Sequence, residues 1–284
     1  MFLAKVALSL IGITALIALP LYFRPRKAIP IPEVTVITPT PTASPSATPT
    51  PKPLTFAEMN QLYGPCVSLP ILMYHHLQPS DQATKNGQMG LTVTPETFAA
   101  HLEYLTQKGY HPITPDQLLA FFTQNQALPG KPIMLTFDDA YSDFADFAYP
   151  LLNQYHFPAT MFVPTGLVDN GGYLSWSQIS SLAGSGLITF GNHTWSHAAM
   201  SGNVDKVVQE ISTAQQQLSS HGLNSNRFFA YPYGSVSSAS INALKQQQFT
   251  LAFTTVNGRT QCKQLPYKLT RIRIGNAPLK NFGL

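Results

Sequence analysis

Short apolar runs alternate with longer amphipathic stretches along the chain from Leu69 onward. The apolar runs have the length and bounded character of buried strands, and the stretches between them have helical periodicity. The predicted strands are Ile71–Tyr74, Ile133–Phe137, Thr160–Val163, Leu187–Phe190, Phe228–Tyr231 and Leu251–Thr254. The predicted helices are Pro95–Lys108, with Thr94 as its N-cap, Ser142–Tyr155, Val204–Ser220 and Ser238–Gln247. This alternation predicts an α/β fold with a mostly parallel sheet, best fitted by a distorted (β/α) barrel that forms a single catalytic domain.

The beginning of the chain has a different pattern. Val6 to Phe23 contains no charged residue and spans about 18 residues, near the lower limit for a membrane-spanning helix. We therefore predict an uncleaved membrane anchor in residues 1–27, with a cleaved signal peptide as the alternative. Residues 28–53 are dominated by Pro, Thr, Ser and Ala, which predicts a semi-extended linker. The folded domain is then expected to be residues 54–284.

The charges around the apolar run disagree with a domain outside the cytoplasm. Lys5 precedes the run, whereas Arg24, Arg26 and Lys27 follow it, and cytoplasmic flanks are usually the richer in Lys and Arg. The linker favours the opposite orientation, since such a segment holds a domain away from a membrane. We expect attachment to the cell membrane with the catalytic domain extracytoplasmic, or secretion if the first segment is cleaved.

Composition and cysteine content narrow the range of partners. The 284 residues include 17 Lys+Arg and 13 Asp+Glu, a formal net charge of +4 without a dense basic stripe, so no nucleic-acid partner is expected. The domain is long enough for its own core, and we expect a monomer. Cys66 and Cys262 lie near the two ends of the domain and are a disulfide candidate in an oxidising compartment; two unrelated buried thiols are the alternative.

Polar clusters follow several of the predicted strands, where the chemistry of β/α barrels collects. Asp138 and Asp139 are adjacent carboxylates that need a cation or hydrogen bonds to offset their repulsion. Because consecutive side chains at a strand end diverge, one can bind a metal while the other acts as a base. The alternative is a pair of acidic residues at a helix N-terminus.

A second cluster contains His193 and His197. If this segment is helical, the two imidazoles lie one turn apart and can reach one metal ion. With Asp139 they form a two-His-one-carboxylate set that serves zinc hydrolases and non-haem iron oxygenases alike. The additional carboxylate of Asp138 favours hydrolysis, because hydrolysis needs a base.

Two smaller clusters end other predicted strands. In Tyr231-Pro232-Tyr233-Gly234, Pro fixes a bend and Gly permits close approach of the backbone, although a simple turn explains the same residues. His75 follows Ile71–Tyr74 and would face the same end of the barrel as an acid, with a core or surface histidine as the alternative.

Together these clusters resemble the polysaccharide deacetylase family, also called the NodB-homology domain or carbohydrate esterase family four. Thr136–Asp139 resembles the first family motif, His193–His197 the second and Tyr231–Gly234 the third, in the family's order. The resemblance covers Leu69 to about Ile274, and the motif-bearing core is about 131–274. The opening Pro70–His76 also resembles the branch that deacetylates poly-N-acetylglucosamine, in which the elements are circularly rearranged.

The resemblance implies a ligand set and catalytic roles. Asp139, His193 and His197 would bind a divalent metal, with zinc expected, and Asp138 would be the general base. The family's late Leu-x-His motif is missing, since no histidine follows Cys262, and the rearranged branch takes its acid from the early Tyr-His, which points to His75.

Other roles come from the same resemblance. Ala230 stands where many members carry an Arg that steadies the catalytic Asp, and Arg271 or Arg273 would supply that guanidinium. The backbone N–H of Tyr233 would hold the oxyanion, while Trp176, Pro232 and Tyr233 would line the substrate site. A Trp at the start of a helix, as expected for Trp176, more often packs in a core.

The implied function is a metal-dependent polysaccharide deacetylase that removes N-acetyl groups from an amino-sugar polymer and releases acetate. A different class of function is a catalytically silent carbohydrate-binding protein on the cell surface, and a third is an oxygenase with the same triad. Peptidoglycan, chitin-like oligomers, exopolysaccharide and acetylated xylan all present acetyl groups, so the polymer stays open.

Overall fold

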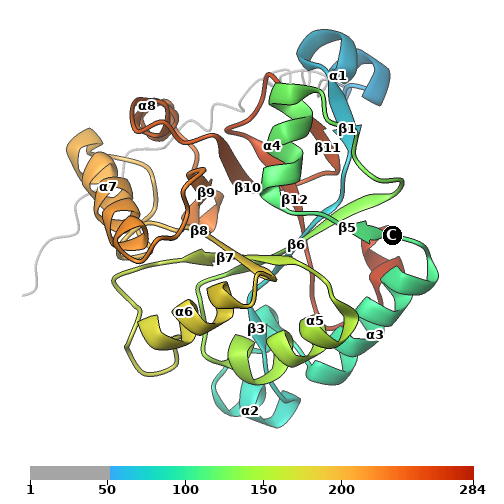
Figure 1. The fold of residues 1–284 in the computed structure, drawn as a ribbon, viewed down its shortest axis with the longest axis vertical. Helices are drawn as coiled ribbons and strands as arrows, with labels where there is room; N and C mark the ends of the chain where they lie inside the picture. Colours follow the sequence, from blue (N-terminus) through green and yellow to red (C-terminus); the bar gives the residue numbers. More distant parts are fainter. Residues whose placement is uncertain (1–51) are drawn as a thin grey trace, which may run out of the picture. The chain divides into compact units, whose positions relative to one another are not determined.

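The computed structural model describes residues 52–284, which form a closed parallel β-barrel surrounded by helices (Figure 1). The eight-stranded main sheet has the order β2-β12-β10-β9-β8-β7-β6-β5, and β2 also pairs with β6, which closes the ring and leaves β5 outside it. The strands are β2 (Ile71–Tyr74), β5 (His111–Pro112), β6 (Pro132–Asp138), β7 (Ala159–Val163), β8 (Ile188–Asn192), β9 (Phe228–Ala230), β10 (Leu251–Asn257) and β12 (Leu269–Arg273). The expected single-domain (β/α) barrel is confirmed.

Helices fill most of the connections between the strands. They are α1 (Phe56–Tyr63), α2 (Ser80–Lys85), α3 (Pro95–Gln107), α4 (Pro115–Gln124), α5 (Tyr149–Tyr155), α6 (Trp176–Gly184), α7 (Val204–Ser220) and α8 (Ser238–Gln246). Short 3₁₀ turns occur at Met89–Leu91, Pro232–Gly234 and Leu279–Phe282. Thr94 is the N-cap of α3 as predicted, because its hydroxyl accepts the N–H of Thr97.

One predicted helix is divided in the structure. In place of a regular helix over Ser142–Tyr155, a π-helical segment covers Phe144–Ala148 and α5 follows it. The N–H of Tyr149 donates to the carbonyl of Phe144, five residues back, and Pro150 has no N–H to offer to a regular ladder. The proline therefore explains why the first half departs from the predicted geometry.

The interior of the barrel is filled by apolar side chains from the beginnings of the strands. Ile71, Phe228 and Leu251 belong to one buried cluster with Leu118 and Phe122 of α4. Since these residues begin their strands, α4 covers the amino end of the barrel. The carboxyl ends of the strands are left for polar groups.

The predicted anchor, residues 1–27, lies outside the described residues, as does the linker over 28–53 except for its last two residues. Between residues 52 and 284, none of the helices combines the length and the apolar character needed to cross a membrane.

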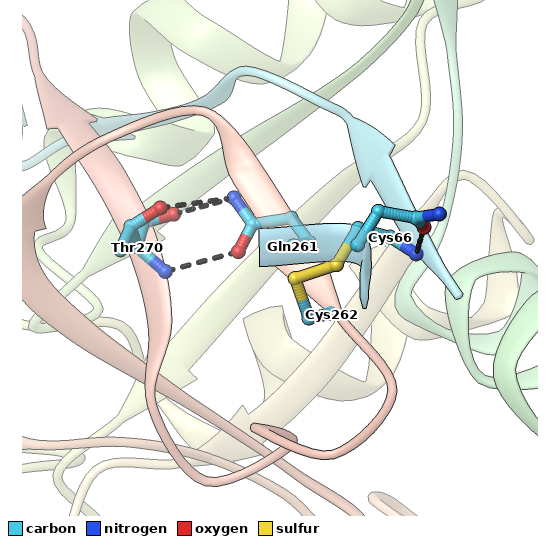
Figure 2. The surroundings of a disulfide bond; sticks show 5 residues. Cys66, Gln261, Cys262 and Thr270 are labelled. Atoms are coloured by element: carbon cyan, nitrogen blue, oxygen red, sulfur yellow. Dashed lines mark hydrogen bonds between the residues drawn. A yellow bond between two sulfur atoms is a disulfide. The ribbon is translucent and has the colours of Figure 1, made fainter. Parts of the chain in front are cut away.

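A disulfide joins the two ends of the domain. β1 (Cys66–Ser68) pairs antiparallel with β11 (Thr260–Cys262), and the Cys66–Cys262 bond lies in this pair (Figure 2). Beside it, the Gln261 amide donates to the carbonyl of Thr270 over 2.9 Å and accepts the Thr270 N–H over 3.0 Å. The bridge thus connects the segments that lead into β2 and β12, which are neighbours in the barrel.

We predict that replacing both cysteines, Cys66→Ser with Cys262→Ser, lowers the free energy of unfolding by about 4 kcal/mol, because the unfolded chain gains freedom. The bond closes a large loop, with a sequence separation of 196. Urea denaturation without reductant measures the effect. Reductant should bring the native protein to the stability of the double variant and leave that variant unchanged; equal midpoints for both proteins without reductant would contradict the prediction.

Candidate active site

The polar residues singled out in the sequence gather at the carboxyl ends of the barrel strands. Asp138 ends β6, His193 directly follows β8, and His75 directly follows β2. Asp139 and Ala140 have φ angles of 77° and 55°, a left-handed conformation that costs non-glycine residues about 1 kcal/mol or more. This turn directs the two adjacent carboxylates to different partners, and no helix begins at them.

Asp138 forms a buried, two-pronged ion pair with Arg271. Nη1 and Nη2 of Arg271 each donate to one carboxylate oxygen over 2.7 Å. Nε donates to the carbonyl of Thr254 over 2.9 Å, and the two paired side chains are 0% and 3% exposed. Burial raises the pKa of Asp138, but the charges of Arg271 and His193 and the hydrogen bonds from Arg271 together outweigh burial and hold this pKa below its usual value. Arg273, also named from the sequence, is exposed at the end of the same strand.

Asp139 faces the two imidazoles. Its Oδ1 lies 3.4 Å from Nε2 of His193 and 3.1 Å from Nε2 of His197, and one ligand atom from each residue falls within 4.8 Å of the others. Burial would raise the pKa of Asp139, but the close contacts with the imidazoles of His193 and His197 and the charges of His193 and His75 together hold it well below its usual value. The Oδ1 atom is buried and makes no hydrogen bond of good geometry within residues 52–284. One carboxylate oxygen and two ring nitrogens around an unsatisfied buried atom fit a divalent cation such as zinc.

The other ring nitrogens of both histidines are held by the end of β9 and the turn that follows it. Nδ1 of His193 lies 2.8 Å from the carbonyl of Ala230, to which it can only donate. Nδ1 of His197 lies 3.0 Å from the hydroxyl of Tyr233, whose ring packs edge-on against that imidazole. These contacts leave both Nε2 atoms directed at Asp139, the usual way in which metal-binding histidines are oriented.

The segment His193–His197 does not form the helical turn that would place the two imidazoles on one helix face. Thr194 and His197 have φ angles of 67° and 58°, and the segment is an irregular loop. The loop carbonyls of Thr194 and Trp195 accept N–H groups from the segment after β7, over 3.1 and 2.7 Å, rather than from a helical turn. The two imidazoles therefore converge because neighbouring segments hold the loop.

Glu210, which the sequence reasoning missed, holds the same loop from α7. Its carboxylate accepts the N–H groups of Trp195 and Ser196 over 3.1 and 2.8 Å, and the Ser196 hydroxyl over 2.7 Å. Glu210 is 6% exposed and lies in the apolar stripe that includes Val207 and Ile211. A charged residue on the buried face of a helix is rare, and this was the available signal in the sequence.

Of the other residues named from the sequence, some lie near the triad and one does not. His75 is partly buried, and burial lowers its pKa. Tyr74 pairs with Phe137 in the sheet, which places His75 beside Asp138 at the ends of β2 and β6. Pro232 is buried in the turn that carries Tyr233, whose side chain is 72% exposed. Trp176 stacks on His221, just beyond the C-terminal end of α7, with ring centroids 4.1 Å apart, and the structure does not bring it to the triad.

Comparisons with known proteins find relatives in sequence and in overall fold. The family described as polysaccharide deacetylase matches residues 125–252. The poly-beta-1,6-N-acetyl-D-glucosamine N-deacetylase of Staphylococcus epidermidis is 27% identical over 199 residues, 65% of this chain and 68% of that protein. The deacetylase PplD of Streptococcus pyogenes, solved with acetate, is 28% identical with a TM-score of 0.67, covering 76% of this chain and 96% of that one. IcaB from Ammonifex degensii is 27% identical with a TM-score of 0.66, covering 76% and 94%.

We predict that Arg271→Met lowers the free energy of unfolding by about 3–5 kcal/mol, because it leaves the Asp138 carboxylate buried without its partner. Arg273→Met, on the same strand but exposed, should change it by no more than about 0.5 kcal/mol. Adding Asp138→Asn to Arg271→Met should restore part of the loss. Chemical denaturation measures the free energy of unfolding of all three variants. Equal losses in Arg271→Met and Arg273→Met would show that the ion pair with Asp138 does not stabilise the fold.

We also predict that Glu210→Ala weakens divalent-metal binding about 10- to 100-fold, because the loop between the two histidines loses its hydrogen-bond acceptors. Glu210→Gln should have a smaller effect, since its amide oxygen still accepts. Gln216→Ala, at an exposed position of the same helix, is the control. Zinc titration against a competing chelator measures the affinities, and an unchanged affinity in Glu210→Ala would refute the role.

Proposed function

We propose that this chain, which carries a polysaccharide deacetylase domain, is a metal-dependent N-deacetylase that releases acetate from a polymer containing N-acetylglucosamine. The relative from Staphylococcus epidermidis is named for that activity, and PplD was solved with acetate. The observation that carries the proposal is the division of two adjacent carboxylates, one facing two imidazoles and the other paired with a guanidinium. This division provides a cation site and an ionised base side by side.

The cation would be held by Asp139, His193 and His197, whose ligand atoms already converge. A divalent ion such as zinc supplies two things when bound there, a lowered pKa for a bound water and polarisation of the acetamide carbonyl. Asp138 accepts the proton of the attacking water. Arg271 fixes the orientation of that carboxylate and keeps it ionised, because it holds its pKa below the usual value.

The leaving amine needs a proton from another residue. His75 follows β2, which pairs with β6 in the barrel, so it lies beside the strand that ends in Asp138. Its lowered pKa makes the protonated imidazole a readier donor, although fewer molecules carry that proton at neutral pH. As the water oxygen bonds to the carbonyl carbon and the C–N bond breaks, the amine takes the His75 proton and acetate departs. The N–H of Tyr233 would stabilise the oxyanion.

We propose that residues 1–27 attach the protein to the cell membrane and that the linker over 28–53 carries the domain to a polymer outside the cytoplasm. The Cys66–Cys262 disulfide supports this placement, because disulfides persist in oxidising compartments.

The alternative of a silent carbohydrate-binding protein rested on the missing arginine at Ala230. Arg271 now pairs with Asp138 through two hydrogen bonds, so the catalytic carboxylate has its guanidinium. The argument for a silent protein therefore loses its basis.

We predict that the purified protein releases acetate from N-acetylglucosamine oligomers, that a chelator abolishes this release and that zinc restores it. Asp138→Asn should lower kcat at least about 100-fold, because general base catalysis is lost. His75→Ala should lower kcat with the bound zinc unchanged, whereas His156→Ala, an exposed histidine, should have no effect. An enzymatic acetate assay, with zinc content measured in parallel, gives these values. Full activity in the presence of the chelator, or in Asp138→Asn, would overturn the assignment.

A further inference from the structure

Trp195 occupies an unusual position between the two metal-ligating histidines. Its side chain is 44% exposed, although large aromatic side chains are usually well buried. Its N–H donates to Glu210 over 3.1 Å and its carbonyl accepts the N–H of Gly166 over 2.7 Å, so its backbone is held on both sides. The residue is thus a firmly positioned aromatic surface next to the catalytic centre.

The absence of a side chain at Gly166 makes room for the indole ring of Trp195. A Cβ atom at this glycine would lie 2.7 Å from Nε1 and 2.8 Å from Cε2 of Trp195, closer than side chains approach one another. The ring therefore rests directly on the backbone of the segment after β7. Any larger residue at this position would push the ring away, so the exposed tryptophan is built into the loop and is not a free surface side chain.

A groove of about 560 Å³ opens beside this ring. It is lined by Trp195 and, along α7, by Asn203, Asp205, Lys206, Gln209, Glu210 and Thr213. The loop that contains His193 and His197 leads from β8 directly into α7, so the first turns of α7 stand at the end of the barrel where the triad lies. Glu210 is already occupied by the loop, but the side chains of Lys206 and Gln209 are exposed.

We infer that this groove binds sugar units of the polymer that flank the unit under hydrolysis, with Trp195 stacking against a pyranose ring. This inference rests on the proposed function and extends it to the length of substrate that the enzyme recognises. A pyranose presents an apolar C–H face and a rim of hydroxyl and acetamide groups. An indole face beside amide, ammonium and carboxylate groups matches both parts, and the groove has a volume typical of ligand sites.

The inference predicts a preference for long substrates that depends on the groove. The native protein should have a higher kcat/KM for a hexasaccharide of N-acetylglucosamine than for the disaccharide, which offers only one flanking sugar unit. Trp195→Ala should reduce the ratio of the two values about tenfold, as expected for the loss of one aromatic stacking contact with its buried area. Zinc content is measured for each variant, because Trp195 lies in the metal-binding loop.

A second variant tests the groove without touching that loop. Lys206→Ala combined with Gln209→Ala removes two exposed groups of α7 and should lower kcat/KM for the hexasaccharide while leaving the disaccharide value unchanged. Phe56→Ala is the matched control, because Phe56 is 48% exposed but lies on α1, which packs against β1 and β11. It should change neither value.

Direct binding provides a readout that does not need turnover. The chain has two tryptophans, and the other one, Trp176, is stacked on His221. Adding the hexasaccharide to Asp138→Asn protein should change its tryptophan fluorescence, and the change should disappear when Trp195→Phe is added. An unaltered length preference in both groove variants, or a fluorescence change that survives Trp195→Phe, would overturn the inference. If the native protein releases no acetate from any oligomer, the proposed function fails instead, while the titration still decides whether the groove binds sugar.

Discussion

The site depends on one electrostatic constraint, which is that two adjacent carboxylates are both buried at the end of one strand. Asp138 is 3% exposed and Asp139 is 7% exposed. Two ionised carboxylates held this close raise each other's pKa unless positive or hydrogen-bonding partners compensate. The structure separates them by the left-handed turn at Asp139 and gives each its own partners, Arg271 for one and two imidazoles for the other. The irregular histidine loop, the acceptor on Glu210 and the arginine of β12 all serve this separation.

The residues around Asp138 come from both ends of the domain, and closure of the barrel brings them together. His75 follows β2 near the start of the domain, and Arg271 lies on β12 near its end, on either side of the boundary where these strands pair. The disulfide between β1 and β11 ties together the segments just before these strands. A covalent link at this position keeps the first and last strands of the barrel side by side. The pairing of β2 with β12 therefore affects both the stability of the fold and the geometry of the site.

The strands of the ring were largely predictable because a parallel strand buried on both faces reads as a continuous apolar run. β12 was missed since its run is broken by Thr270 and Arg271, and Arg271 is polar because it reaches Asp138.

The sequence did not show which of Arg271 and Arg273 pairs with Asp138, because side chains two residues apart point to the same face of a strand. Only the depth in the barrel distinguishes them. The sequence left open whether His193–His197 is helical, because Glu210 accepts loop N–H groups from residues 14 and 15 positions away, a contact that local periodicity cannot reveal.

Ala230 shows that Asp138 needs a positively charged partner but that this partner can come from different strands. Its side chain belongs to the apolar cluster inside the barrel, and its carbonyl holds His193. The guanidinium enters from β12 instead, where Phe162 lies under it and Thr254 accepts from Nε. Arg271 already balances the single charge of Asp138, so a second arginine at position 230 would place an uncompensated cation in the barrel interior, at a cost of several kcal/mol. An arginine at position 230 and an arginine at position 271 are therefore alternative ways to balance the charge of Asp138, and pairing from β12 requires an uncharged residue at position 230.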